Sequence, residues 1–277
     1  MKRYRTGFWA SGLLLFLVTA SGEEREDGYV SFVACPVARH QGPWRDVCFI
    51  ARHEGREYAL RNPPDYGEPQ LKHRILVEGR IVEGEEYCGA QLLDGRFSVL
   101  REIDQNCNEI IPYTGPITDT PPPSSGRQGA YVSDDPQWAH LHPSVRPVMN
   151  QLPDLAVLPL PEGPPWQPQR QTIYYPFDSD RASGPDMARL VQLVEYAIAS
   201  NARFEIRSYQ GQSLLDSGEV MTERPGMARQ RAEKLRDILI GLGIDESRLT
   251  IAWEPEPIVG TGREDWRSRR IEVHLEP

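Results

Sequence analysis

The sequence has no surplus of basic residues and no long apolar run. Its 277 residues contain 31 Lys and Arg against 40 Asp and Glu, which gives a formal net charge of −9. Nucleic-acid-binding faces are basic, so this balance argues against a nucleic-acid partner. With 39% hydrophobic and 26% charged residues, the composition excludes a polytopic membrane protein and is typical of a soluble folded chain. The length suggests about two domains.

Recognisable catalytic motifs are also missing. The chain has no G-x-S-x-G, no H-E-x-x-H and no nucleophile arrangement of Cys and His. The segment Gly260-Thr261-Gly262 lacks the Lys-Ser/Thr of a phosphate-binding loop. His140 and His142 could share a metal ion, but they lie in a Pro-rich stretch, so we assign no metal site. We therefore expect no enzyme and no cofactor.

The N-terminus has the pattern of a secretory signal peptide, covering residues 1–20. Basic residues within the first five positions precede an apolar run from Phe8 to Val18, and a cleavage site follows at Ala20. A membrane anchor is the alternative, but a run of this length is too short for a bilayer that requires about 20 residues. Cleavage would remove three basic residues and no acid, so the net charge would fall from −9 to −12.

Four cysteines, Cys35, Cys48, Cys88 and Cys107, fall within the first 110 residues, and none forms a C-x-x-C pair. Their spacing does not indicate a zinc or thioredoxin-like site. An even number of cysteines in an exported chain predicts two disulfides. Of the three possible pairings we favour Cys35–Cys48 and Cys88–Cys107, because each of these pairs brackets a local hairpin.

Residues 21–110 have the pattern of a small all-β domain. Short segments rich in β-branched and aromatic residues are separated by turn signals such as Glu54-Gly55, Glu83-Gly84-Glu85 and Asp94-Gly95. The expected strands are 29–34, 47–51, 57–60, 73–83, 86–93 and 97–100. The number of strands and the long central hairpin around Gly79 suit an OB-like barrel. A core this small would be stabilised by the two disulfides.

Residues 111–170 are predicted to be a linker. Between Pro112 and Pro168 the sequence contains 14 prolines in 57 residues. Such a segment cannot form regular structure and is expected to run extended, partly as polyproline II.

Residues 171–277 change to a pattern that alternates strands and helices. A strand at 172–175 is followed by a helix that starts near Ser183, with Pro185 in its first turn. A strand at 203–209, a helix at 226–242 that stops at Gly243, and strands at 249–253 and 270–275 complete the order β-α-β-α-β-β. This order predicts an α+β domain with two helices on a mixed sheet.

Several motifs of this last segment stand in the order and spacing of one known family. They are Phe177-Asp178-Ser179-Asp180 after the first strand, Arg231-Ala232-Glu233-Lys234-Leu235 in the second helix, Gly243-Ile244-Asp245 after it, and Ser268-Arg269-Arg270-Ile271-Glu272-Val273 at the last strand. Over residues 171–277 the chain resembles the OmpA-like C-terminal domain family, which binds peptidoglycan. Residues 1–170 have no part in this resemblance.

The resemblance implies how such a domain would hold the diaminopimelate residue of the peptide stem. Arg231 stands at the family's Arg position, where a guanidinium can bind the ligand's carboxylate bidentately. The family's Asp, the partner of the ligand's ammonium, is replaced here by Gly211. Asp216 lies fifteen residues before Arg231 and could take that role if the extra residues from Gln212 to Leu215 loop out. Arg269, in the last motif, completes the candidate binding residues, and Ser268 replaces the family's Asn.

Two functional hypotheses follow. In the first, a non-enzymatic periplasmic protein, with outer-membrane association as a further option, docks on peptidoglycan through the OmpA-like domain. Its N-terminal β domain would then meet an envelope protein partner. In the second, the OmpA-like domain is degenerate, does not bind peptidoglycan, and serves as a protein-binding or assembly module.

Overall fold

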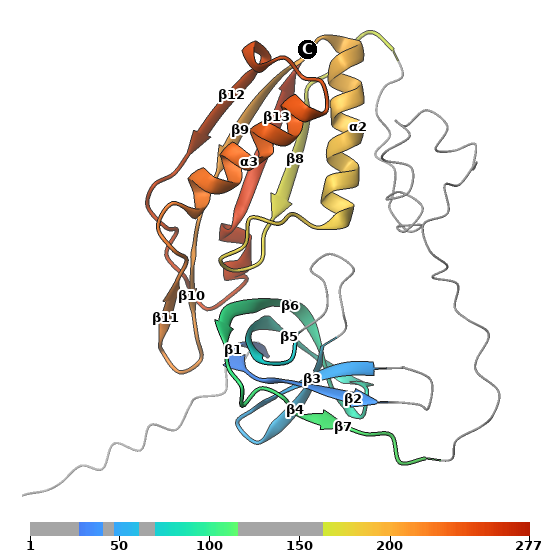
Figure 1. Cartoon of the computed structure of the whole chain (residues 1–277), viewed down its shortest axis with the longest axis vertical. Coiled ribbons are helices and arrows are strands. Elements are labelled where there is room, and N and C mark those ends of the chain that lie inside the picture. Colours follow the sequence, from blue (N-terminus) through green and yellow to red (C-terminus); the bar gives the residue numbers. More distant parts are fainter. Residues whose placement is uncertain (1–27, 41–46, 61–69, 116–162) are drawn as a thin grey trace, which may run out of the picture.

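A computed structural model describes residues 28–40, 47–60, 70–115 and 163–277 (Figure 1). The expected signal peptide, most of the Pro-rich linker and both linker histidines lie outside these residues. The described part consists of an N-terminal barrel, residues 28–115, and a C-terminal module, residues 163–277. Among the described residues, no helix combines the length and the apolarity that crossing a membrane would require.

Seven strands form the sheet of the barrel. They are β1 (Tyr29–Ala34), β2 (Pro36–His40), β3 (Val47–His53), β4 (Arg56–Leu60), β5 (His73–Tyr87), β6 (Ala90–Ile103) and β7 (Ile110–Ile111). Their order is β1-β5-β6-β4-β3-β2-β7. Because β1 continues through Cys35 into β2, the two halves of one bent strand close the sheet. All pairs among these strands are antiparallel except β4 with β6 and β2 with β7. The expected all-β domain is confirmed.

The central hairpin of the barrel is longer than the sequence suggests. Strands β5 and β6 turn at Cys88-Gly89, whereas the expected turn at Glu83–Glu85 lies within β5. Gly79 and Gly95 are paired across this ladder, and a Cβ on Gly79 would lie 2.8 Å from the Cα of Gly95. The two backbones approach so closely that only glycine fits, so Gly95 lies at a close approach of two paired strands and not in a turn.

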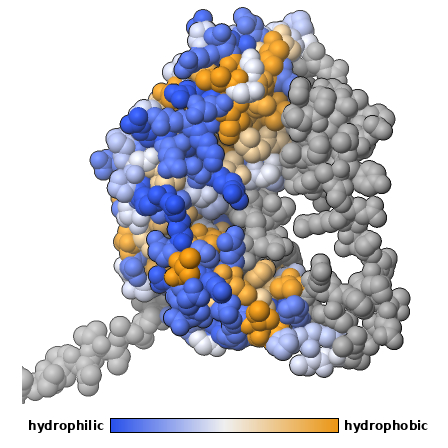
Figure 2. Space-filling model, in the orientation of Figure 1, coloured by the Kyte–Doolittle hydropathy of each residue, from blue (hydrophilic) through white to orange (hydrophobic). Residues whose placement is uncertain are grey.

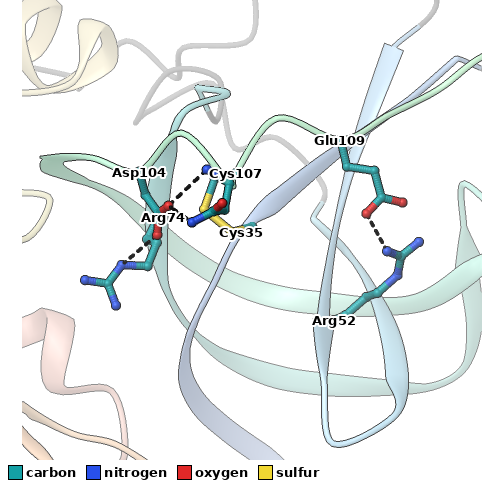
Figure 3. The surroundings of a disulfide bond; sticks show 7 residues. Cys35, Arg52, Arg74, Asp104, Cys107 and Glu109 are labelled. Atoms are coloured by element: carbon teal, nitrogen blue, oxygen red, sulfur yellow. Dashed lines mark hydrogen bonds and ion pairs between the residues drawn. A yellow bond between two sulfur atoms is a disulfide. The ribbon is translucent and has the colours of Figure 1, made fainter.

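Both disulfides form, but the favoured pairing is wrong. The bonds are Cys35–Cys107, shown in Figure 3, and Cys48–Cys88. In the β2–β3 ladder Cys48 faces Arg39, which is four residues from Cys35. At about 3.4 Å per residue this offset is roughly 14 Å, too far for a disulfide. Cys35 instead lies at the bend between β1 and β2, where the chain that follows β6 returns to it.

The C-terminal module contains two helices and a four-stranded sheet. Its main elements are β8 (Gln169–Tyr174), α2 (Gly184–Ser200), β9 (Arg203–Ser208), α3 (Met227–Gly241), β12 (Leu249–Trp253) and β13 (Arg270–Glu276), with short 3₁₀ helices η2 (Glu246–Arg248) and η3 (Asp265–Ser268). The sheet order is β12-β9-β13-β8. The pair β12–β9 is parallel and the others are antiparallel. The expected α+β order is confirmed.

Helix α2 begins as the sequence predicts, because Ser183 caps it by accepting from the N–H of Asp186 at 3.0 Å. Both helices pack on one face of the sheet, where Leu193 and Leu239 are fully buried in the same cluster. Ile198, near the end of α2, is 55% exposed and takes no part in this core. The face of the molecule seen in Figure 2 is hydrophilic over much of its area, with the largest area of hydrophobic side chains over the C-terminal module at the top and smaller areas over the barrel.

One element of the module was not expected from the sequence. Strands β10 (Gln212–Leu214) and β11 (Val220–Thr222) form a hairpin between β9 and α3. It extends from the module toward the barrel (Figure 1). The residues from Gln212 to Leu214, which would have to loop out for Asp216 to replace the family's Asp, are therefore strand residues.

Candidate functional site

Arg231, the candidate carboxylate ligand, is fully buried at the start of α3. Its Nε donates to Ser179 O at 2.8 Å, and its two terminal nitrogens donate to Tyr209 O at 3.2 Å and Pro176 O at 3.3 Å. The guanidinium also lies over the ring of Tyr175, 4.9 Å from its centroid. Burial raises the pKa of the Tyr175 phenol far above its usual range, although the charge of Arg231 works in the opposite direction.

The fork of Arg231 is occupied by the carboxylate of Glu223, which is also fully buried. Nη1 donates to Oε2 at 3.1 Å, and Nη2 donates to Oε1. The same two oxygens accept from the backbone N–H groups of Asp178 and Gly211, each at 2.9 Å. A carboxylate that receives two guanidinium and two amide donors has its hydrogen-bonding capacity filled.

Gly211, which replaces the family's Asp, lies against Ser268. A Cβ built on Gly211 would fall on Ser268 Oγ and lie 2.7 Å from Ser268 Cβ. That hydroxyl in turn donates to Asp265 O at 2.5 Å. The space that a side chain at position 211 would need is therefore filled, and the two departures from the family pattern are complementary.

Asp216, the candidate replacement acid, binds the barrel. Its Oδ2 accepts from the N–H of Ser31 at 2.9 Å, and its own N–H donates to Ser31 O at 2.8 Å. The same carboxylate oxygen lies 3.6 Å from Nε2 of His53, whose ring is stacked on Phe32 at 4.2 Å. These contacts of Asp216 are made with strands β1 and β3 and not with Arg231.

Arg269, the third candidate, forms a buried ion pair with Glu78 of the barrel; each side chain is only 1% exposed. Its Nη2 donates to Glu78 Oε2, and its Nη1 donates to Ser213 Oγ at 2.8 Å. Ser213 itself donates to the other carboxylate oxygen, Glu78 Oε1, at 2.9 Å. Glu78 of the barrel therefore binds two parts of the module, Arg269 directly after η3 and Ser213 in β10.

Apolar contacts surround this polar network. Leu76 and Leu100 of the barrel form one buried cluster with Phe177 and Leu215 of the module. The N–H of Phe177 also donates to Ser98 Oγ at 2.8 Å. The barrel and the module are thus joined by an interface that is both apolar and hydrogen-bonded.

Trp266 is in contact with two guanidinium groups. Arg96 of the barrel is 4.3 Å from its ring centroid and Arg267 is 4.7 Å away. Tyr174 contacts it edge-on at 5.0 Å. The ring is part of the contact between barrel and module.

Sequence reasoning missed the two acids that matter most, Glu223 and Glu78. Glu223 lies just eight residues before Arg231, in the short segment between the hairpin and α3, and this proximity was a usable signal. Glu78 directly follows the apolar run Ile75-Leu76-Val77, a position at which an ionised side chain is costly unless it is paired. Its partner is 191 residues away, and nothing local identifies it.

No protein-family model matches the chain, and no curated protein does. Thirteen chains of solved structures match. The OmpA-like domain of FopA1 from Francisella tularensis subsp. tularensis SCHU S4 is 14% identical and covers 40% of this chain and 73% of its own, with a TM-score of 0.31. A putative MotB-like protein from Desulfovibrio vulgaris is 17% identical over 39% and 74%, with a TM-score of 0.31. The periplasmic domain of Helicobacter pylori MotB is 15% identical over 40% and 76%, with a TM-score of 0.30.

Proposed function

We propose that this protein is an exported, non-enzymatic protein of the cell envelope. Its C-terminal module serves to bind protein surfaces, and the surface that it binds within this chain is that of the N-terminal barrel. The observation that carries the proposal is the buried pair of Glu78 and Arg269. Two charges leave water only where their geometry and hydrogen bonds compensate the desolvation, as they do here through Ser213. An interface with a buried ion pair whose hydrogen bonds are satisfied is typical of a permanent contact between two parts of a protein.

Peptidoglycan docking is the second candidate, and it has support of its own. Arg231 stands at the position where the resembled family binds the diaminopimelate carboxylate. All three candidate residues, Arg231, Asp216 and Arg269, have partners within the chain. Docking through them would require those partners to leave, so we place this function second.

The periplasm is the proposed location, because the signal-peptide pattern and the cysteine usage both fit an oxidising compartment outside the cytoplasm. Association with the outer membrane is an extension of the same proposal. A further envelope protein that binds the barrel would fit this location.

Cosedimentation with purified sacculi separates the two candidates. The full exported chain is mixed with sacculi, centrifuged and assayed in pellet and supernatant, with sacculus-free tubes as the control. We expect the chain to stay in the supernatant. Sedimentation that free meso-diaminopimelate reverses would overturn the first proposal and establish peptidoglycan docking.

A further inference from the structure

The surroundings of Glu223 have the composition of a receptor for a carboxylate. The guanidinium fork of Arg231 donates to both carboxylate oxygens, and the backbone N–H groups of Asp178 and Gly211 each donate to one of the same oxygens. Such a combination of bidentate Arg and backbone amides is how proteins bind carboxylate ligands.

Arg231, which provides the guanidinium of this arrangement, is held in place by contacts that do not involve Glu223. Three of the five N–H donors of Arg231 are taken by the main-chain carbonyls of Pro176, Ser179 and Tyr209. The face of the guanidinium rests on Tyr175. The two remaining donors are therefore held in a set orientation by the fold, and they point to the place where a carboxylate sits.

Glu223 reaches this place from the end of the β10–β11 hairpin. It directly follows Thr222 of β11, and its own N–H donates to Gly211 O at 3.2 Å. The hairpin is in turn held by the barrel, through Asp216 at its turn and through Leu215 in the shared apolar cluster. The side chain is thus delivered by a segment that a second part of the protein keeps in position.

We propose that Glu223 is a resident substitute ligand, a carboxylate of the chain's own hairpin that closes the Arg231 site against external carboxylates. The site itself is intact. It would accept the carboxylate of an amino acid or peptide once the Glu223 side chain leaves. This inference does not depend on whether the protein binds sacculi, because it concerns the occupancy of one site in the soluble chain.

The test is rescue by a small carboxylate. Glu223→Ala in the full chain removes the resident group and leaves room for acetate. We expect a lower melting temperature in sodium chloride, and an increase in sodium acetate of the same ionic strength. Once acetate saturates the site, the increase should be about 3–5 °C per tenfold rise in concentration. Acetamide, which has no charge, should not reproduce it.

Two controls define the result. Glu219→Ala removes an exposed carboxylate from the same hairpin and should respond to acetate as the wild type does. The double variant Glu223→Ala/Arg231→Met removes the receptor as well and should also be insensitive. If the single variant aggregates, its refolding yield from urea is compared in acetate and in chloride. A response of Glu223→Ala to acetate no larger than that of Glu219→Ala, or equal refolding yields, would overturn the proposal.

Discussion

Glu78 and Arg269 are 191 positions apart in the sequence and form one buried ion pair between the barrel and the C-terminal module. Ser213 completes the network by binding both side chains. Together with the apolar cluster that the barrel and the module share, the pair joins these two parts of the chain into one unit. It also removes from solvent an arginine that the sequence offered as a ligand-binding residue.

Glu78→Ala is expected to destabilise the protein by about 3–5 kcal/mol, because it leaves the charge of Arg269 buried without its partner. Urea denaturation of the full chain measures this loss. Glu83→Ala, an exposed acid on the same strand, is the matched control and should change the stability by less than about 0.5 kcal/mol. Similar midpoints for the two variants would show that the ion pair is not what joins barrel and module.

The Glu78–Arg269 pair also predicts that the barrel and the module stay associated after the chain between them is cut. A specific protease site introduced between residues 116 and 162 would separate the barrel from the module covalently. We expect the two pieces to co-elute in size-exclusion chromatography, since the interface is apolar as well as ionic. The Glu78→Ala chain cut at the same site should elute as two species. Separate elution of the wild-type pieces would contradict the interface.

Gly211→Ala should destabilise the module by about 1–3 kcal/mol, because the new methyl group meets Ser268 in a filled space. Adding Ser268→Gly should recover part of this loss, so that the double variant is more stable than the sum of the single changes. Gly241→Ala, at a helix position where nothing lies within 4 Å, is the control and should be neutral or slightly stabilising. Thermal denaturation is measured for Gly211→Ala, Ser268→Gly, the double variant and Gly241→Ala. If the effects of the two single changes add exactly in the double variant, the contact between positions 211 and 268 would be contradicted.

Removal of either disulfide should cost about 2–4 kcal/mol. The Cys35–Cys107 bond closes a longer stretch than Cys48–Cys88, with separations of 72 and 40 residues, so its loss should cost slightly more, by roughly 0.5 kcal/mol in the chain-entropy account. Peptide mapping without reduction should find these two linkages. Detection of Cys35 linked to Cys48 would contradict the barrel's register.

A pH dependence is expected at Glu57 on β4. Hydrogen bonds from Arg39 and then from Arg52 hold the pKa of its carboxyl below the ordinary value of 4.5. Because the folded-state pKa is the lower one, the stabilisation is present above the unfolded pKa and disappears as the pH falls through the folded value. Glu57→Gln should therefore be less stable than the wild type near pH 7, by no more than about 1 kcal/mol at this partly exposed position. The difference should vanish in acid, and a difference that persists there would exclude the ionic explanation.

Much of the fold could be read from local pattern. Helix α2 begins where Ser183 and Pro185 predict it, because capping and helical periodicity act within a few residues. The four strands of the C-terminal sheet and the oxidised state of all four cysteines were predicted for the same kind of reason. The candidate site was only half predicted, since Arg231 was identified and the carboxylate in its fork was not.

The sequence by itself determined the elements, their order and the residue types available for binding a carboxylate. The tertiary structure decided which cysteines pair, that Asp216 and Arg269 bind the barrel, and that Glu223 fills the site at Arg231. The first two outcomes depend on strand register and on contacts between segments far apart in the chain. The third involves residues only eight positions apart, but it depends on the hairpin that carries Glu223 being held in place by the barrel. No local preference encodes such contacts, because a buried charge is compensated only by the particular donors that the complete fold brings to it.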